Sequence, residues 1–436
     1  MSKKKFHLGW FTNFALDDWN TPLASGGMPW DGQFYVDMAQ MLERACFDYI
    51  MLEDTLLISD TYGDSREVYL KHGLMAPKGD PTPLAVLLGS KTKHLGVVST
   101  MSTISYHPFT LARLCSTVDS LIDGRFGWNI VTSGEDAAAQ NLGMDKLPPR
   151  QLRYDMADEY VAACRALWNS WEPGAVVRDR DTSTYVDHTK VHEVNFKGEY
   201  FSTRGPLNTV PSPQIQPTLV QAGGSPRGRE FAARTADSII APSSGVAGIK
   251  AYRDDIRARA AAAGRNPDDI KVLFVVAPIV GATEEEAKAK ARRITEAPDY
   301  LEKVLASISL ITDIDFSKFD PDQPLPDHME TNGEQGSLDA FAQWGSGKTL
   351  RDLALEQVSR GLPGMIGTPE QVADNLCAVM DEVGGDGFLI TKPFTTFIGR
   401  QHVTDICEGL VPELQRRGRV RTEYTADTLR GTLREF

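Results

Sequence analysis

Short apolar runs alternate with longer amphipathic segments along almost the whole chain. Eight of the short runs have the length of a strand and are rich in β-branched and aromatic residues. This alternation is typical of β–α units around a parallel sheet, and eight strands are the number that closes a barrel. The predicted strands are His7–Asn13, Tyr49–Asp54, Leu95–Ser102, Arg125–Thr132, Thr218–Ala222, Ser238–Pro242, Val272–Val280 and Gly387–Thr391.

The amphipathic segments between these strands carry apolar residues three and four positions apart, as a helix needs in order to bury one face against a sheet. Together with the strands they predict an α/β fold, a TIM-like (β/α)8 barrel with insertions. The clearest predicted helices are Phe34–Phe47, Pro108–Ile122, Arg150–Trp171, Arg227–Thr235 and Pro369–Val383.

Three connections are much longer than the few residues that usually join a strand to a helix. They cover about residues 56–83, 172–216 and 283–362. We interpret them as excursions from a single barrel domain that spans residues 1–436. Val191–Phe201 alternates around a Lys-Gly pair and predicts a β-hairpin in the second excursion. The third is predicted to be mostly helical, and its segment about Asp320–Lys348 is a candidate lid.

Composition excludes several classes of binding partner and site. The chain of 436 residues has 41% hydrophobic residues and a net charge of −13, which argues against general binding to nucleic acid or to anionic membranes. Its five cysteines are scattered without a C-x-x-C pair, so we expect neither a disulfide framework nor a metal site. The start lacks a signal-like apolar core and no apolar run could cross a bilayer, so we expect a cytoplasmic protein.

Polar residues gather where several predicted strands end. Asn129 lies in the run Gly124–Ser133, among the apolar strand residues Phe126, Trp128, Ile130 and Val131, and the polar Thr132 and Ser133 end the run. Thr100 and Ser102 end the third strand, and Asp54 ends the second. Because the carboxyl ends of parallel strands meet at one mouth of a barrel, these side chains could surround a planar, hydrogen-bonding ligand. Ordinary capping of strand ends explains them almost as well.

A glycine-rich turn follows the predicted strand Thr218–Ala222. Gly223 and Gly224 permit close approach of the backbone to a ligand, and Ser225 supplies a hydroxyl where the next helix begins. Unpaired amide groups at the start of a helix point toward bound anions, so this turn is a candidate phosphate site. The alternative is a plain strand-to-helix turn capped by Ser225.

These residues, taken together, closely resemble the bacterial luciferase-like flavin monooxygenases, in the branch of nitrilotriacetate monooxygenase component A and dibenzothiophene-sulfone monooxygenase. The resemblance spans nearly the whole chain. The segments that carry it are Phe47-Asp48-Tyr49, Glu53-Asp54, Tyr106-His107-Pro108-Phe109, Ala112-Arg113, Gly124–Ser133, Arg153-Tyr154, Gly205-Pro206-Leu207-Asn208, Gln221-Ala222-Gly223 with Ser225, Gly367-Thr368-Pro369-Glu370 and Asp386-Gly387-Phe388.

The resemblance implies the oxygenase component of a two-component monooxygenase. Such an enzyme takes reduced FMN from a separate NAD(P)H-dependent flavin reductase and inserts one atom of dioxygen into a small organic substrate. The family also tends to form homo-oligomers. By position, the resemblance implies that FMN contacts Asp54, Thr100, Ser102, Asn129, Tyr154 and Ser225, with the amides of Gly223 and Gly224 beside its phosphate.

One position departs from the family pattern. The family usually has a histidine four residues before the tyrosine of the Arg-Tyr pair, where this chain has Arg150. Arg150 could meet a phosphate or a flavin oxygen, but it cannot exchange protons as an imidazole does. His107 is then the nearest candidate for a catalytic acid, although its place before Pro108 fits a helix cap equally well.

Two other functions stay open from the sequence. One is a deazaflavin-dependent oxidoreductase of the same superfamily, and the other is a flavin-binding protein without turnover, which the Arg150 departure permits. Aromatic residues near the first strand suggest an apolar or aromatic substrate, although core packing accounts for some of them. They are Trp10, Phe11, Phe14, Trp19 and Trp30.

Overall fold

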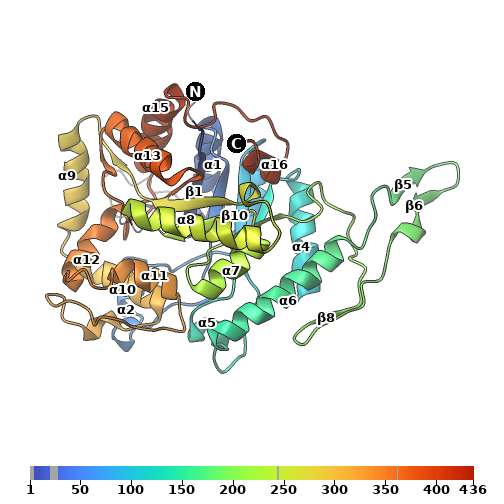
Figure 1. Cartoon of the computed structure of the whole chain (residues 1–436), viewed down its shortest axis with the longest axis horizontal. Helices are drawn as coiled ribbons and strands as arrows, with labels where there is room; N and C mark the ends of the chain where they lie inside the picture. Colours follow the sequence, from blue (N-terminus) through green and yellow to red (C-terminus); the bar gives the residue numbers. More distant parts are fainter. Residues whose placement is uncertain (1–3, 20–27, 243–244, 361) are drawn as a thin grey trace.

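The computed structural model describes residues 4–19, 28–242, 245–360 and 362–436. Eight parallel strands form a closed barrel in the order β1-β14-β11-β10-β9-β4-β3-β2. This confirms the predicted (β/α)8 barrel and the place of every predicted strand. Figure 1 shows β1 and β10 of this barrel among the surrounding helices. The strands are β1 (His7–Asn13), β2 (Tyr49–Glu53), β3 (Gly96–Ser102), β4 (Phe126–Val131), β9 (Thr218–Gln221), β10 (Ser238–Pro242), β11 (Lys271–Val276) and β14 (Gly387–Ile390).

One predicted strand is too long. The run predicted as Val272–Val280 leaves the barrel after Val276, and its last part becomes β12 (Ile279–Val280). This short strand pairs in parallel with β13 (Ile366–Gly367), outside the barrel. Pro278 lies at the break, and proline has no N–H to donate to a ladder, so the continuous apolar run does not continue as one barrel strand.

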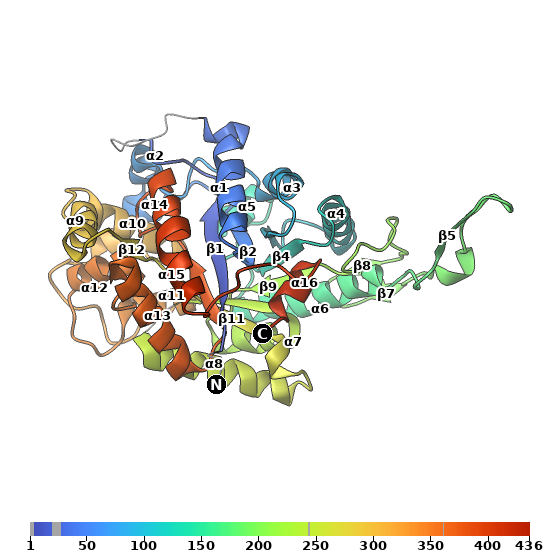
Figure 2. The same ribbon diagram turned by 90° about the horizontal axis from the view of Figure 1, so that it is seen from above.

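Helices surround the strands, as Figure 2 shows from above. The five predicted helices are confirmed, with ends that shift by a few residues at most. Chief among the helices around the barrel are α1 (Gln33–Arg44), α3 (Pro81–Lys91), α4 (Pro108–Leu121), α6 (Arg150–Trp168), α7 (Pro226–Thr235), α8 (Gly245–Ala262), α13 (Pro369–Val383), α14 (Arg400–Thr404) and α15 (Val411–Arg416). Within the described part of the chain, no helix is both long enough and apolar enough to cross a bilayer.

The amino-terminal end of the barrel interior is closed by α16 (Leu429–Leu433). Leu429 and Leu433 pack into one cluster with interior side chains such as Met51 and Val98. A Cβ atom on Gly96, the first residue of β3, would lie 2.4 Å from a methyl carbon of Leu429. Since this end of the interior is filled, the interior opens toward the carboxyl ends of the strands.

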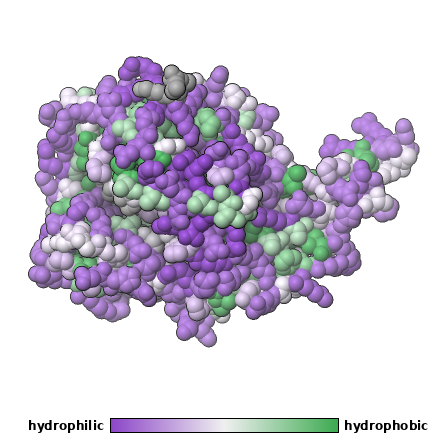
Figure 3. All heavy atoms as spheres, in the orientation of Figure 1, coloured by the Kyte–Doolittle hydropathy of each residue, from purple (hydrophilic) through white to green (hydrophobic). Residues whose placement is uncertain are grey.

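The second excursion forms an arm that extends away from the barrel (Figures 1 and 3). It contains two antiparallel pairs, β5 (Val176–Asp179) with β6 (Thr184–Val186), and β7 (Phe196–Lys197) with β8 (Ser202–Thr203). The second pair is the hairpin predicted around the Lys-Gly sequence, with its strands placed slightly later along the chain.

The first and third excursions lie next to each other. The first contains α2 (Glu67–His72), which contacts α10 (Tyr300–Thr312) of the third. The third is mostly helical, as predicted, and has a small apolar core of its own. Its other helices are α9 (Glu284–Thr295), α11 (Gln335–Ala342) and α12 (Leu350–Glu356).

Candidate active site

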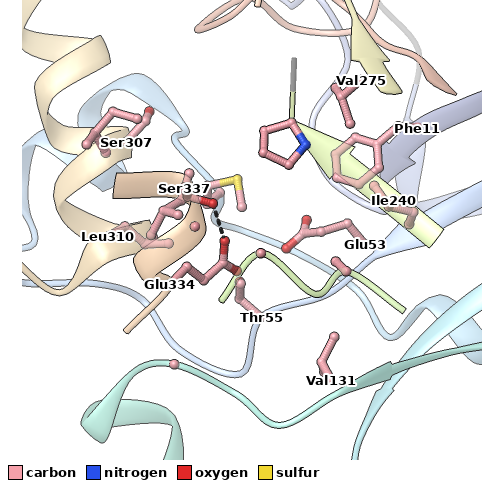
Figure 4. A pocket seen from close by; sticks show the side chains of 18 of the residues that line it. Phe11, Glu53, Thr55, Val131, Ile240, Val275, Ser307, Leu310, Glu334 and Ser337 are labelled. Atoms are coloured by element: carbon pink, nitrogen blue, oxygen red, sulfur yellow. Dashed lines mark hydrogen bonds between the residues drawn. The ribbon is translucent and has the colours of Figure 1, made fainter. Parts of the chain in front are cut away.

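A cavity of about 1110 Å³ opens at the carboxyl ends of the barrel strands. Its floor includes Phe11, Ile240 and Val275 from three strands, and its opposite wall includes Leu310 and Glu334 from the third excursion (Figure 4). Small-molecule sites in proteins usually enclose roughly 300–1,000 Å³. The cavity is therefore large enough for a cofactor with a second small molecule beside it.

Thr100 and Asn129 lie side by side on this mouth. They are paired in register between β3 and β4, and the Asn129 Nδ2 group donates to Thr100 Oγ1 at 2.8 Å. Both side chains are buried and line the cavity. The Asn129 Oδ1 atom is buried without a hydrogen-bond partner among the described residues. A buried acceptor of this kind is costly unless a ligand donates to it, so Asn129 marks a binding position.

Asp54 and Ser102 also line the cavity, as the sequence predicts. Ser102 Oγ lies 2.8 Å from Ser133 Oγ, so these two hydroxyls satisfy each other. Burial raises the pKa of Asp54 to about 7, with Lys78 acting in the opposite direction. The ammonium group of Lys78 is 2.8 Å from the Glu53 carboxylate and is thereby partly neutralised. Asp54 is thus poised to gain or lose a proton near neutral pH.

The glycine-rich turn joins β9 to α7 beside the same cavity. Ser225 is the N-cap of α7 and accepts from the Gly228 amide at 3.1 Å, while its hydroxyl hydrogen remains free to reach a ligand. A Cβ atom on Gly223 would lie 2.4 Å from the Gly228 carbonyl oxygen, so this tight turn requires glycine. Gly224 and Ser225 line the cavity, whereas Gly223 lies just behind them.

The two arginines that follow this turn are already engaged. Arg227 reaches Asp155 at 2.9 Å and Asp158 at 2.5 Å, and Arg229 donates to the Gly224 carbonyl at 2.9 Å. An anion at the start of α7 would therefore be met by backbone amides and the Ser225 hydroxyl rather than by these side chains.

Arg150 and Tyr154 reach the cavity from the first two turns of α6. Burial raises the pKa of Tyr154, which keeps its phenol protonated and able to donate. The Arg150 Nε atom is buried without a partner among the described residues. Tyr154 is hydrogen-bonded to the Gln221 side chain, and both Arg150 and Tyr154 bring hydrogen-bond donors to the cavity wall.

His107 does not line the cavity. It is exposed at the start of α4, where its Nδ1 atom accepts from the Phe109 amide at 3.2 Å. Its neighbour Tyr106 lines the cavity instead. This geometry favours the helix-cap interpretation of His107 over the catalytic one.

The candidate lid covers the mouth at its polar side. Arg153 holds the lid residue Asn332 through its carbonyl at 2.8 Å and its side-chain oxygen at 3.1 Å. A Cβ atom on Gly224 would lie 2.7 Å from Gly336 Cα, which shows how closely the glycine-rich turn meets α11. The lid thereby closes directly over the predicted phosphate position.

Two carboxyl groups meet where the lid contacts the loop after β4. Glu135, at the N-cap of α5 (Asp136–Asn141), accepts from the Gly134 amide at 3.2 Å. Burial, and then the charge of Glu334, raise the pKa of Glu135 to about 7. Glu334 lies at the cavity wall, where desolvation also raises its pKa, and its carboxylate accepts from the Ser337 hydroxyl at 2.7 Å (Figure 4).

Two half-buried cations that the sequence analysis missed complete the cavity wall. Lys392 follows Thr391 at the end of β14, and Arg360 follows α12 in the third excursion. Lys392 could have been found by the rule that functional groups follow barrel strands. Arg360 lies in the excursion and carries no such signal.

The aromatic substrate wall predicted near the first strand is largely wrong. Only Phe11 of the five residues lines the cavity. Trp10 is fully buried against Phe47, because alternate residues of a strand face opposite sides of the barrel. Phe14 packs against Trp30, and Trp19 is mostly exposed.

Residues 6–387 match the family model described as Luciferase-like monooxygenase. The chain belongs to the luciferase-like monooxygenase family. It is 35% identical to nitrilotriacetate monooxygenase component A of Aminobacter aminovorans, over 99% of this chain and 97% of that protein. It is 33% identical to dibenzothiophene-sulfone monooxygenase of Rhodococcus erythropolis, over 92% of this chain and 89% of that protein.

Solved structures agree with this assignment. A riboflavin lyase, crystallised with modified FMN and its substrate riboflavin, superposes with a TM-score of 0.89 at 32% identity, over 99% of this chain and 96% of that one. The comparisons confirm the family resemblance drawn from the motifs, the TIM-like fold, and the prediction of a flavin-dependent monooxygenase.

Proposed function

We propose that this chain is the oxygenase component of a two-component system that uses reduced FMN and dioxygen to oxidise a small organic substrate. One oxygen atom enters the substrate, the other leaves as water, and FMN leaves in its oxidised form. The observation that carries the proposal is the Asn129 Oδ1 atom, which has no partner among the described residues and is buried in the same cavity that the Gly224-Ser225 turn lines. One side of the cavity thus offers positions for a polar ring and for a phosphate.

The residues present fit FMN. The phosphate would lie at the start of α7, against the Ser225 hydroxyl and the amides that follow Gly223 and Gly224. The ring would lie near Asp54, Thr100 and Asn129, with Ser102 behind them. Arg150 and Tyr154 would donate hydrogen bonds to the cofactor between these two ends. Bound reduced FMN supplies the electrons with which dioxygen is activated.

The protein's own contribution is positioning and the exclusion of water. Asn129 and Thr100 fix each other's orientation, so the ring would meet a preorganised pair. The lid, held by Arg153 through Asn332, would cover the cofactor and limit the escape of reactive oxygen. No protein nucleophile is required, because the cofactor carries the difficult step.

Reduced FMN would come from a separate NAD(P)H-dependent flavin reductase, which places the reaction in the cytoplasm, where that reductant is available. The cavity opens at the mouth of the barrel, so a flavin could enter and leave when the lid opens. Reduced FMN would then pass from the reductase to this chain by free diffusion.

We also propose that the chain forms a homo-oligomer through the arm of the second excursion. The β5–β6 hairpin extends away from the barrel (Figure 2), and an isolated two-stranded hairpin is only marginally stable in water. The hydrophobic residues Val177 and Tyr185 are exposed on it. A second copy of the chain would supply the surface that covers them.

The experiment that tests the function begins with anaerobic titration of the purified chain with reduced FMN and with reduced deazaflavin. We expect tight binding of reduced FMN and weaker binding of the deazaflavin. Mixing the complex with ¹⁸O-labelled dioxygen and a panel of substrates should then give one labelled oxygen atom per product molecule. Absence of affinity for FMN in both redox states would refute the proposal, and tight binding without any labelled product would favour a non-catalytic flavin-binding protein.

A further inference from the structure

Arg360 and Lys392 present positive charge to the cavity without a carboxylate partner among the described residues. The Arg360 guanidinium stacks on the Phe394 ring, with its central carbon 4.2 Å from the ring centroid. Its Nε atom is buried and unpartnered in the described part of the chain. The Lys392 ammonium donates only to the carbonyl of Thr396 in the same loop, as far as the structure describes.

Lys348 of the same cavity is paired, 2.7 Å from a Glu356 oxygen. Arg150 and Arg153 also lack an ion pair among the described residues, but they lie on α6, on the side proposed for FMN. Arg360 and Lys392 differ from Lys348 because no adjacent carboxylate in the described part of the chain offsets their desolvation. Burial lowers the pKa of Arg360 to about 10, and burial with the charge of Arg360 lowers the pKa of Lys392 to about 7. Partly desolvated cations that lack a counter-charge gain strongly from an anionic ligand.

The two cations lie across the mouth from the proposed cofactor position. In the closed barrel, β14 is separated from β4 by three strands in either direction, so Lys392 after β14 is opposite Asn129 on β4. The residues proposed for FMN follow or lie on β2, β3, β4 and β9. The remaining strands contribute the apolar floor of Phe11, Ile240 and Val275 (Figure 4).

We propose that Arg360 and Lys392 bind an anionic group of the substrate, so that the substrate is an organic acid, a carboxylate or a sulfonate. This inference rests on the proposed function, in which the opposite side of the cavity holds FMN. The acidic group lies between the two cations, and the apolar part of the molecule lies over Phe11, Ile240 and Val275. This orientation directs the apolar part toward the flavin and keeps the charged group away from it.

The test uses pairs of probes that differ only in charge: benzoate with benzamide, hexanoate with hexanamide, and benzenesulfonate with benzenesulfonamide. Their binding to the full chain is measured by calorimetry without flavin, so the result does not depend on oxygenation. We expect at least one acid to bind about tenfold or more tightly than its amide. Equal affinities within every pair, or no binding of any acid at millimolar concentration, would overturn the proposal.

Substitutions assign the effect to the two residues. Arg360→Gln and Lys392→Gln should each weaken the acid about tenfold and leave the amide unchanged, while Lys392→Arg should keep the preference. The matched control is Arg351→Gln, which removes an exposed cation of the same excursion that pairs with Asp322. An equal loss in the control would overturn the proposal. Circular dichroism and thermal unfolding check that each variant is folded.

A further measurement distinguishes binding of the substrate anion from binding of the cofactor phosphate. FMN also carries an anionic group, so its affinity is measured for the same variants. We expect Arg360→Gln and Lys392→Gln to leave FMN affinity unchanged. If both lose FMN affinity about tenfold, the cations hold the cofactor phosphate and the inference is wrong, although the oxygenase function would stand. Conversely, a chain that prefers acids but binds no flavin would refute the function and retain the anion site.

Discussion

The backbones of Gly224 and Gly336 meet between the glycine-rich turn and the lid. A Cβ atom on Gly336 would lie 2.6 Å from Gly224 Cα, and one on Gly224 would lie 2.7 Å from Gly336 Cα. Neither position can accept a side chain unless the two segments move apart. The lid and the proposed phosphate site therefore form one packed unit. The lid can close only because both positions are glycine and have no Cβ atom.

We expect Gly336→Ala to hold the lid away from the turn. Alanine favours helices more than glycine does, so α11 itself should not be weakened. FMN affinity should fall about tenfold, a loss of about 1.4 kcal/mol, and release of hydrogen peroxide per FMN oxidised should rise. Calorimetry and a peroxide assay measure the two effects. Gly409→Ala is the control, since its Cβ would meet only Pro369 at an ordinary 3.5 Å; the same loss in that variant would contradict the explanation.

Asn129→Leu tests the unpartnered acceptor. The substitution removes a buried polar group whose oxygen lacks a partner in the described part of the protein, so the fold should persist, while the ring of FMN loses its hydrogen bond. A lost bond of this kind costs about 1–3 kcal/mol, which is roughly a 5- to 150-fold weaker affinity. Fluorescence titration with FMN measures the change. The control is Asn169→Leu, at an exposed position, which should bind FMN as the unmodified chain does. Unchanged FMN binding in Asn129→Leu would argue against a contact between Asn129 and the ring.

The carboxyl pair of Glu135 and Glu334 predicts a lid that loosens as pH rises. The pKa of Glu135 in the folded protein is about 7, above its usual value. Its contribution to stability is therefore complete at acidic pH and is lost as pH rises through about 7. Above that pH two charged carboxylates oppose each other between the lid and the loop after β4. The other acidic groups that act on Glu135 are Glu53 and Asp313.

Hydrogen exchange of residues 331–342 at pH 6 and pH 8 measures this effect after correction for the intrinsic rates. Protection should be lower at pH 8 in the unmodified chain. Glu135→Gln should remove most of the difference, whereas Glu423→Gln, at an exposed site away from the lid, should not. Equal pH dependence in Glu135→Gln and the unmodified chain would contradict the role of this pair.

The barrel could be predicted from sequence because each strand is a short buried run between amphipathic helices. The carboxyl-end rule then placed Asp54, Thr100 and Asn129 at the mouth, where the structure has them. The separate interpretation of Trp10 as part of an aromatic substrate wall failed, because proximity to the first strand does not say which side of the barrel a residue faces.

Contacts that depend on the excursions could not be predicted. Arg360 and Glu334 reach the cavity, and Asn332 reaches Arg153, through the packing of a helical insertion. Their sequence separation from the barrel strands leaves no periodic signal. Lys392 follows a strand directly, so the same rule that found Asp54 would have found it.

Removal of the arm's apolar contacts tests self-association. We expect Val177→Ser combined with Tyr185→Ser to shift the chain toward the monomer, because the substitutions remove the two exposed apolar side chains that the second copy would cover. Light scattering after gel filtration measures the mass. Leu70→Ser changes an exposed apolar residue on α2 and should leave the assembly intact. A monomeric unmodified chain, or an unchanged mass in the double variant, would refute the proposed interface.

Lys392 predicts how the binding of an organic acid depends on pH. Burial and Arg360 lower the pKa of its ammonium group to about 7, while Glu53 acts to raise it and Lys78 to lower it. Below about pH 7 the charged Lys392 attracts the anion, and above it the neutral amine does not, so the affinity for the preferred acid probe should fall between pH 6 and pH 9.

Binding of the anion in turn raises the pKa of Lys392, so proton uptake should accompany binding near pH 7 to 8. Calorimetry in two buffers of different ionisation enthalpy measures that uptake. Lys392→Arg keeps its charge across this range and should bind the acid with little pH dependence, and a fall as steep as in the unmodified chain would assign the titration to another group.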